Sequence, residues 1–169
     1  MSGPLSKIAS ALLSTVPTLL TILLMIFFTL PIRLPFFELM PMIIAVASVY
    51  YWSIYRPELM PVGAVFLIGL VHDFFSGGPF AVMALALLAL HLVTLTQRET
   101  LASKTFLVIW LSVVLVGLVP TLLVWFIYMI YFGQLLNPTP FVFQYLAVII
   151  LYPLLAEFFN VSRIRLLKI

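Results

Sequence analysis

The sequence has no cysteine and little charge. None of its 169 residues is cysteine, and 8% are charged. Without cysteine, the chain has no disulfide, no thiolate nucleophile and no cysteine-ligated zinc or iron–sulfur site. The 8 Lys and Arg against 5 Asp and Glu leave a net charge of +3, too small and too scattered to form a phosphate-binding face for nucleic acid. These absences argue against redox enzymes, secreted disulfide scaffolds and nucleic-acid-binding proteins.

Hydrophobic residues take the place of charge. They make up 65% of the chain, and the mean hydropathy is +1.31. Elements that are apolar on every face are typical of helices surrounded by lipid. No loop is long enough to form a water-soluble domain. We therefore expect an all-α integral membrane protein with a single polytopic membrane domain over residues 1–169.

Charged residues divide the chain into apolar intervals. An ionised side chain at the middle of a bilayer costs roughly 2.5 to 3.5 kcal/mol on insertion scales, so each interval is a candidate span. The first is too long for a signal peptide, and we expect it to remain as an anchor. The second ends in aromatic residues that we expect at headgroup depth: Tyr50, Tyr51, Trp52 and Tyr55. The expected spans are residues 8–32, 39–55, 61–75, 79–96, 105–132 and 141–159.

The interval 61–75 is short and is followed by a helix break at Ser76-Gly77-Gly78-Pro79, so it either crosses the bilayer or re-enters it. The positive-inside rule favours crossing. Six crossings place seven of the eight basic residues on one side, with only Arg33 opposite. We therefore predict six transmembrane helices with both termini in the cytoplasm. The residues placed together are Lys7, Arg56, Arg98, Lys104, Arg163, Arg165 and Lys168.

Asp73 is the ionisable residue that lies deepest in this scheme. A helix that starts near Pro61 has risen only about 18 Å at position 73, inside a hydrocarbon layer of about 30 Å. One interpretation makes Asp73 a proton-binding or substrate-binding group, or the partner of Arg33. The interpretation that we favour is structural: the carboxylate accepts free backbone N–H groups of the turn at Ser76-Gly77-Gly78.

The two histidines do not form a catalytic or metal-binding pattern. His72 is next to Asp73 in sequence but about 100° around the helix, so we expect the two side chains to diverge. His91 is too far along the next span to reach Asp73, and we expect it to form a hydrogen bond between helices. The chain contains no HExxH, P-loop, GxGxxG or nucleophile-elbow motif. The sequence predicts no catalytic residue, no metal site and no cofactor.

Charged residues near the predicted cytoplasmic surface have two interpretations each. Arg56-Pro57-Glu58 is either a docking point for a cytoplasmic partner or, as we favour, a topology anchor whose Glu58 pairs with Arg56. Glu157 is expected to extend to the surface or to pair with Arg163 or Arg165. The basic segment 163–168 either lies on the anionic inner leaflet or, as we favour, anchors the topology.

The segment from Arg56 to Phe80 resembles the rod shape-determining protein MreD family of bacterial inner-membrane proteins. That family has an Arg-Pro pair, a helix with the pattern Phe-x-x-Gly-x-x-x-Asp, and a Gly-Pro turn. One position departs from the pattern, because Ala81 stands where family members commonly have Gly. Length, six-span hydropathy and the basic C-terminus also resemble the family. The matching residues are Arg56, Pro57, Phe66, Gly69, Asp73, Gly78 and Pro79, with Gly77 beside them in the turn.

The resemblance implies a multi-pass protein of the bacterial inner membrane that belongs to the cell-elongation machinery and is not an enzyme. Its implied partners are an MreC-like bitopic protein and, through it, an MreB-like actin homologue and the peptidoglycan synthases of sidewall growth. The family's helical arrangement is similar to that of substrate-binding subunits of energy-coupling-factor vitamin transporters, so a transporter subunit with Asp73 facing a ligand is the alternative. A membrane enzyme acting on lipid-linked precursors would need two convergent polar groups, for which only Asp73 and Arg33 qualify.

Overall fold

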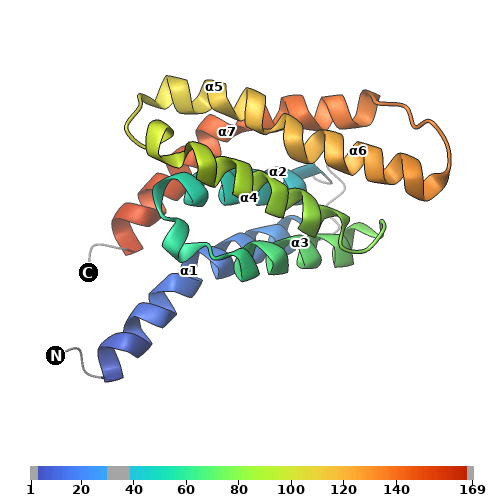
Figure 1. Cartoon of the computed structure of the whole chain (residues 1–169). Helices are drawn as coiled ribbons and strands as arrows, with labels where there is room; N and C mark the ends of the chain where they lie inside the picture. Colours follow the sequence, from blue (N-terminus) through green and yellow to red (C-terminus); the bar gives the residue numbers. More distant parts are fainter. Residues whose placement is uncertain (1–3, 30–38, 167–169) are drawn as a thin grey trace.

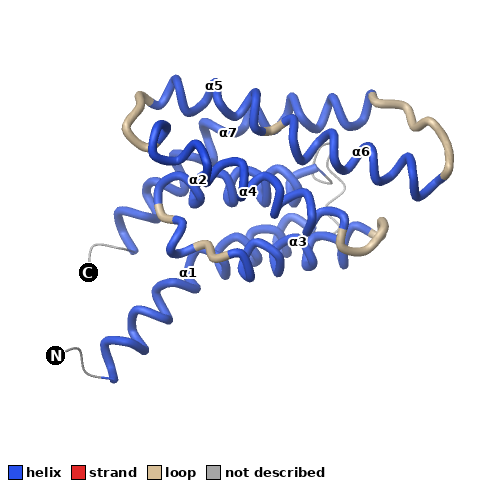
Figure 2. Tube along the Cα trace, viewed as in Figure 1, coloured by secondary structure: helices blue, strands red, loops and turns tan. Residues whose placement is uncertain are grey.

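A computed structural model describes residues 4–29 and 39–166, and all regular structure in these ranges is helical. Figures 1 and 2 show long helices lying side by side. Consecutive helices run in opposite directions, except that α5 and α6 follow one another along nearly one line. The elements are α1 (Pro4–Thr29), α2 (Met40–Tyr55), the 3-10 helix η2 (Pro57–Leu59), α3 (Val62–Ser76), α4 (Val82–Leu101), α5 (Phe106–Val116), α6 (Leu118–Phe132) and α7 (Thr139–Leu166).

Helix α2 is the centre of the bundle. Every residue from Met42 to Ile54 is buried, and α2 contacts α1, α3, α4 and α7. Small side chains such as Ala45, Ala47 and Ser48 let these neighbours approach it from several sides, which gives the interior of the bundle its packing density. The hydroxyl of Ser48 forms a hydrogen bond with Thr21 of α1, so this buried polar group of α2 is paired inside the protein. A helix that is apolar all round is here a buried one.

The two ends of the bundle are distinct in Figure 1. One end holds the start of α1, η2, the α4–α5 connection and the end of α7, and we call it the η2 end. The other end holds the α3–α4 turn and the α6–α7 loop, and we call it the Gly77 end. Helix α3 runs between these two ends beside α4, so the segment predicted at 61–75 is one helix along the length of the bundle.

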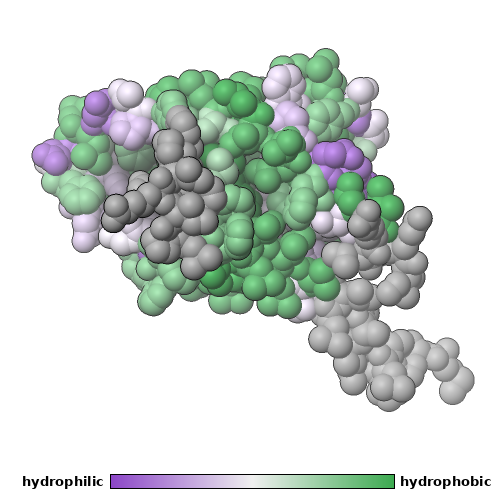
Figure 3. All heavy atoms as spheres, turned by 180° about the vertical axis from the view of Figure 1, so that it is seen from behind, coloured by the Kyte–Doolittle hydropathy of each residue, from purple (hydrophilic) through white to green (hydrophobic). Residues whose placement is uncertain are grey.

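Helices of the described part are suited to a membrane. Three are long and apolar enough to cross one, namely Val82–Leu101, Phe106–Phe132 and Thr139–Ile164. Three shorter apolar helices accompany them: Thr15–Thr29, Met40–Tyr55 and Val62–Ser76. Seen from behind, hydrophilic side chains gather toward the two ends, and a broad hydrophobic surface lies between them (Figure 3). The all-α class is confirmed for these residues, whereas the six crossings stay a prediction.

The predicted span 105–132 is interrupted. It consists of α5 and α6, which meet at Gly117. Pro120 explains the break, because its ring clashes with the carbonyl four residues earlier and it has no N–H to donate. Side chains donate to backbone carbonyl groups near the break: Thr121 donates to the Gly117 oxygen at 2.9 Å, and the Tyr145 hydroxyl of α7 donates to the Val114 oxygen.

Pro153 also removes a backbone hydrogen bond in α7, but the helix continues through it. A proline frees the carbonyl oxygen four residues earlier, which here belongs to Ile149. The indole N–H of Trp110 in α5 donates to that oxygen at 2.9 Å. Helices α5 and α7 are therefore joined by two hydrogen bonds, each of which fills a backbone position that a proline or a break leaves open.

The aromatic residues at the end of α2 are not at the protein surface. Tyr50, Tyr51 and Trp52 are at most 2% exposed, and only Tyr55 is partly exposed. Their expected position at headgroup depth stays a prediction, but three of the four members are buried between helices and do not face lipid. Their rings pack against α7, where Tyr50 contacts Tyr152 with ring centroids 5.5 Å apart. Aromatic residues are common both at the membrane surface and between helices, and the position of the neighbouring helix decides which of the two applies.

The predicted helix break at Ser76-Pro79 is present and extends to Ala81. Helix α3 ends at Gly77, whose φ of 67° is a left-handed conformation that glycine adopts without steric cost. Helix α4 begins after Ala81, which has φ 69° and is the only non-glycine residue with positive φ among those described. An Ala side chain strains this conformation, because its Cβ approaches the following carbonyl oxygen.

We predict that Ala81→Gly stabilises the protein. Removing the Cβ relieves the left-handed strain, which outweighs the extra freedom of glycine in the unfolded chain, and the free energy of unfolding rises by about 1 kcal/mol. Denaturation of the purified protein in detergent micelles measures it. Ala86→Gly, in the buried interior of α4, is the control and lowers the same quantity by about 1 kcal/mol. A loss of stability in Ala81→Gly would contradict the strain argument.

Candidate functional site: the hairpin of α3 and α4

One face of α3 packs against α4. Its buried residues are Val65, Ile68, Gly69 and Asp73, whose spacing of three or four residues places them on one side of the helix. Phe66 lies off this face and is 37% exposed. The glycine and the aspartate of the pattern Phe-x-x-Gly-x-x-x-Asp therefore share the interface, and the phenylalanine points elsewhere.

Gly69 allows the two helices to come into contact. A Cβ added to it would lie 2.2 Å from the Cα of Ala84 and 2.6 Å from its backbone nitrogen. Real Cβ atoms do not approach backbone atoms so closely, so no other residue fits here without moving α4. The contact partner, Ala84, also has a small side chain, and it is fully buried. Close approach at Gly69 brings the first turn of α4 within reach of a side chain one helical turn further along α3.

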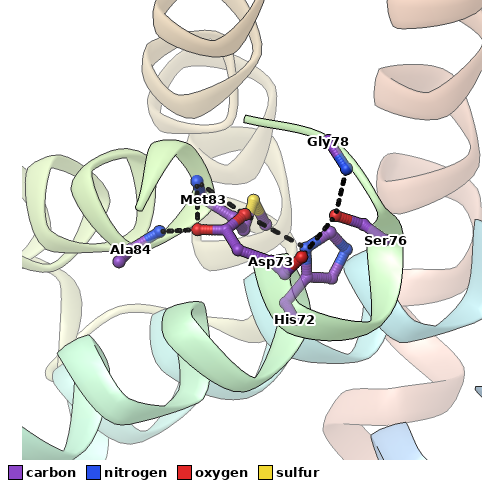
Figure 4. Close-up of polar contacts among 6 residues, drawn as sticks. All are labelled: His72, Asp73, Ser76, Gly78, Met83 and Ala84. Carbon is purple, nitrogen blue, oxygen red and sulfur yellow. Dashed lines mark hydrogen bonds and ion pairs between the residues drawn. The ribbon is translucent and has the colours of Figure 1, made fainter. Parts of the chain in front are cut away.

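That side chain is Asp73, which caps the start of α4 (Figure 4). Met83 donates its backbone N–H to Oδ1 at 3.1 Å and to Oδ2 at 3.0 Å, and Ala84 donates to Oδ2 at 3.3 Å. The carboxylate is buried, with Asp73 only 5% exposed. Our structural interpretation was right in kind but wrong about the donors, because they belong to α4 and not to the turn at Ser76-Gly77-Gly78.

The preceding helix, α3, supplies this cap because α4 has no capping side chain of its own. Its N-cap residue is Ala81, which has no side-chain acceptor. The first backbone N–H groups of a helix lack partners within it, and its N-terminal end favours negative charge. A carboxylate that receives these N–H groups satisfies both requirements. The turn itself is held by Ser76, which donates to the Asp73 carbonyl at 3.2 Å and accepts the Gly78 N–H at 3.5 Å (Figure 4).

His72 lies nearer to Asp73 than expected. Its Nδ1 is 3.7 Å from Oδ1 of Asp73, so the prediction that the two side chains diverge is wrong. The distance is too long for a hydrogen bond, and Nδ1 is buried with no hydrogen-bond partner among residues 4–29 and 39–166. Arg33, the other proposed partner of Asp73, lies outside the described residues.

The rest of the pattern is spread over the bundle. Gly78 lies against α6, where an added Cβ would be 2.2 Å from the hydroxyl oxygen of Tyr128, and Pro79 is half-buried in the same turn. Arg56 and Pro57 lie at the opposite, η2 end. Arg56 Nη1 is 3.1 Å from Oε1 of Glu58, and both side chains are about half exposed. The predicted pairing of Arg56 with Glu58 is confirmed, and these residues do not belong to the hairpin site.

His91 forms the predicted hydrogen bond between helices. Its Nδ1 is 2.7 Å from Oγ of Ser53 in α2, and both residues are buried. The sequence contained no signal for Ser53 as the partner, because a serine in a helix usually bonds its own backbone. Ser53 does this as well, by donating to the Val49 carbonyl. This hydrogen bond joins α4 to the central helix α2.

The side chain of Glu157 is exposed, as extension to the surface requires, and Arg163 has other partners. Arg163 donates to Oδ1 of Asn160 at 2.9 Å, and its guanidinium lies 4.8 Å from the ring centroid of Tyr55. Its neighbour is therefore an aromatic ring of α2, where the sequence suggested the carboxylate of Glu157. The side chain of Arg165 lies outside the described part. This contact attaches α7 to α2 at the η2 end.

The hairpin joins two helices rather than arranging reactive groups. The carboxylate of Asp73 receives N–H donors on both oxygens, and the close neighbours at Gly69 are backbone and methyl atoms. Within the described residues, no group of three His, Asp or Glu side chains has a geometry suited to a metal ion. What the arrangement does is hold two antiparallel helices and the turn between them in one position.

We predict that Gly69→Ala destabilises the hairpin. The new methyl group overlaps backbone atoms of Ala84, which have no free space to move into, and the free energy of unfolding falls by about 1 to 3 kcal/mol. Gly63→Ala is the matched control, because it lies on the same helix with nothing within 4 Å of an added Cβ. We expect that control to be neutral or to gain about 0.5 to 1 kcal/mol. Equal stability of the two variants would refute the close contact.

We predict a graded loss of folded protein on changing Asp73. Asp73→Ala leaves buried N–H groups of Met83 and Ala84 without an acceptor, and it lowers the free energy of unfolding by roughly 2 to 6 kcal/mol, since each costs about 1 to 3 kcal/mol. Asp73→Asn keeps one acceptor oxygen and falls between Ala and the wild type. The fraction of monodisperse protein at a fixed detergent concentration, measured by fluorescence-detected size-exclusion chromatography, reports the order of stability of the three proteins. Glu58→Ala, in an exposed pair, is the control, and an unchanged Asp73→Ala would disprove the cap.

Comparison with known proteins adds nothing to the geometry of the site. We found no family model, no curated protein and no solved structure that matches the chain.

Proposed function

We propose that this chain is a non-enzymatic membrane scaffold of the bacterial cell-elongation machinery, similar to the rod shape-determining protein MreD family. In this proposal it crosses the inner membrane six times, with both termini in the cytoplasm. It binds an MreC-like bitopic protein and, through it, helps to position an MreB-like actin homologue and the peptidoglycan synthases of sidewall growth. The remaining surface faces the lipid bilayer.

The observation that carries the proposal is the use of Asp73 as a cap for α4. A transporter subunit or a membrane enzyme would need this carboxylate to face a ligand or a substrate. Both of its oxygens instead receive backbone N–H groups, and Gly69 brings the donors to it. Residues on which the resemblance depends thus have a structural role, as a scaffold requires.

The distribution of charge supports the proposed orientation. In the part that the structure describes, every charged residue except Asp73 is at or near the η2 end, where basic residues favour the cytoplasmic side. Both the start of α1 and the end of α7 lie at this end as well (Figure 1). Those whose side chains the structure describes are Arg56, Glu58, Arg98, Glu99, Lys104, Glu157 and Arg163.

Size and surface support binding through the membrane. The connections between described helices are short, so little of the protein is available outside the bilayer. Large hydrophobic side chains are exposed along α5, α6 and α7, where Leu115, Ile130 and Leu154 are each at least 66% exposed. A transmembrane helix of a bitopic partner meets such a surface through van der Waals contact, as helices do within a bilayer.

Crosslinking in intact cells tests the proposal. The tagged protein is crosslinked in its host, extracted in mild detergent and analysed by mass spectrometry for the proteins that remain attached. We expect an MreC-like bitopic protein and cell-wall synthases to be enriched. We also expect rod-shaped cells depleted of this chain to become round, because sidewall synthesis loses its positioning.

An unrelated multi-pass protein with the same tag and expression level is the control for non-specific capture. The Asp73→Asn variant, at a level where it folds, should capture the same partner, because the proposal gives Asp73 no contact with it. Recovery of a pair of transporter ATPases would contradict the scaffold and favour the substrate-binding subunit. Loss of a measurable turnover in a well-folded Asp73→Asn variant would favour an enzyme.

A further inference from the structure

Helix α3 is short for a membrane crossing. It has 15 residues and is therefore about 22 Å long, whereas the hydrocarbon of a bilayer is about 30 Å thick. The segment of α5 and α6, Phe106–Phe132, has 27 residues and α7 has 28, so each is about 40 Å long. In Figure 1 the α6–α7 loop extends past the α3–α4 turn at the Gly77 end. The two connections at this end therefore differ in their distance from the η2 end.

The α3–α4 turn exposes three aromatic rings. Phe74 is 75% exposed, Phe80 is 67% exposed and Phe75 is 48% exposed. The sequence from Phe74 to Gln97 contains no Asp, Glu, Lys or Arg. Apolar side chains gathered at one place on a surface, with no charge among them, mark contact with a membrane or with a protein. Interfaces between helices in a membrane favour small side chains, so these large rings fit lipid better than another helix.

The polar groups of the turn are bonded within the protein. Asp73 receives the backbone N–H groups of Met83 and Ala84, and Ser76 accepts the Gly78 N–H (Figure 4). In hydrocarbon, where water is not available as a partner, irregular backbone is tolerated only when other groups of the protein bond it. The side chains of Asp73 and Ser76 thus make this turn compatible with a position below the membrane surface.

The α6–α7 loop has a different character. The amide side chains of Gln134 and Asn137 are exposed, and Oδ1 of Asn137 accepts the Thr139 N–H at 3.0 Å. Exposed amide groups are suited to water or to lipid headgroups, and they are costly in hydrocarbon. The loop follows the long helix pair and precedes the longest helix, which together are long enough to place it at the membrane surface.

We propose that the α3–α4 turn lies among the acyl chains of the leaflet at the Gly77 end, where Phe74, Phe75 and Phe80 contact lipid. The α6–α7 loop reaches the water on the same side. The partner of the turn is therefore the hydrocarbon of the membrane, and in the proposed orientation this is the outer leaflet. The inference rests on the proposed function only in that α3 crosses the membrane, and it requires no partner protein.

Spin labels on single cysteines measure these depths. The chain has no cysteine, so Phe80→Cys and Phe74→Cys each introduce one labelling site. The purified full chain is reconstituted in vesicles of dioleoylphosphatidylcholine. Collisions of the label with oxygen, which concentrates in hydrocarbon, are compared with collisions with a neutral nickel chelate, which stays in water. We expect the oxygen-to-nickel ratio at both sites to be several-fold higher than at Leu135→Cys.

Two further positions calibrate the ratio. Leu135→Cys is the matched control, because Leu135 is another apolar side chain at the Gly77 end and is 88% exposed, but it belongs to the α6–α7 loop. Ile150→Cys, at a side chain of α7 that is 70% exposed, gives the value expected in lipid.

Two results would overturn the proposal. A ratio at Phe74 and Phe80 as low as at Leu135 would place the turn in water, as local thinning of the bilayer does. Low collision rates with both reagents would show that protein, such as a second copy of the chain, covers the turn. Neither result changes the capture of a bitopic partner by crosslinking in cells, so a failure here is distinct from a failure of the proposed function.

Discussion

In hydrocarbon, the first turn of a helix carries backbone N–H groups that no solvent can reach, and α4 starts with such a turn inside the bundle. Its own N-cap residue, Ala81, offers no acceptor, so the requirement passes to Asp73 on the preceding helix. The carboxylate reaches the N–H groups of Met83 and Ala84 only because Gly69 lets the helices touch. The position of α3 against α4, and of the turn between them, depends on this interaction.

The same constraint explains the contacts of α5, α6 and α7. Proline and helix breaks leave carbonyl oxygens without donors, and in a dry interior other side chains must supply them. Trp110 donates to the Ile149 carbonyl that Pro153 leaves open, and Tyr145 donates to Val114 near the Gly117 break. Each of these bonds joins two helices. Irregular backbone thus becomes a set of specific contacts that fix how the outer helices sit against one another.

Most buried polar groups serve to join helices, and this bears on what the protein can do. Among the described residues, buried Asp73 and His91 both have hydrogen-bond partners in neighbouring helices, which leaves them in positions that hold the bundle together. On the face that Figure 3 shows, the surface between the two ends is hydrophobic, and charge in the described part is concentrated at the η2 end. A surface of this kind is suited to contact with other membrane segments. The scaffold that we propose uses this property.

The sequence by itself determined the helical class, the position of the break after Ser76 and the bounds of α2 and α3 to within one residue, because long apolar intervals and Gly-Pro turns are local signals. It also indicated that Asp73 satisfies backbone groups and that His91 bonds another helix. Only the tertiary structure decided which groups those are. The Met83 and Ala84 donors, Ser53 as the partner of His91, and the burial of Tyr51 all depend on neighbours distant in sequence. In an apolar chain, lipid-facing and protein-facing residues have the same composition, so packing alone separates them.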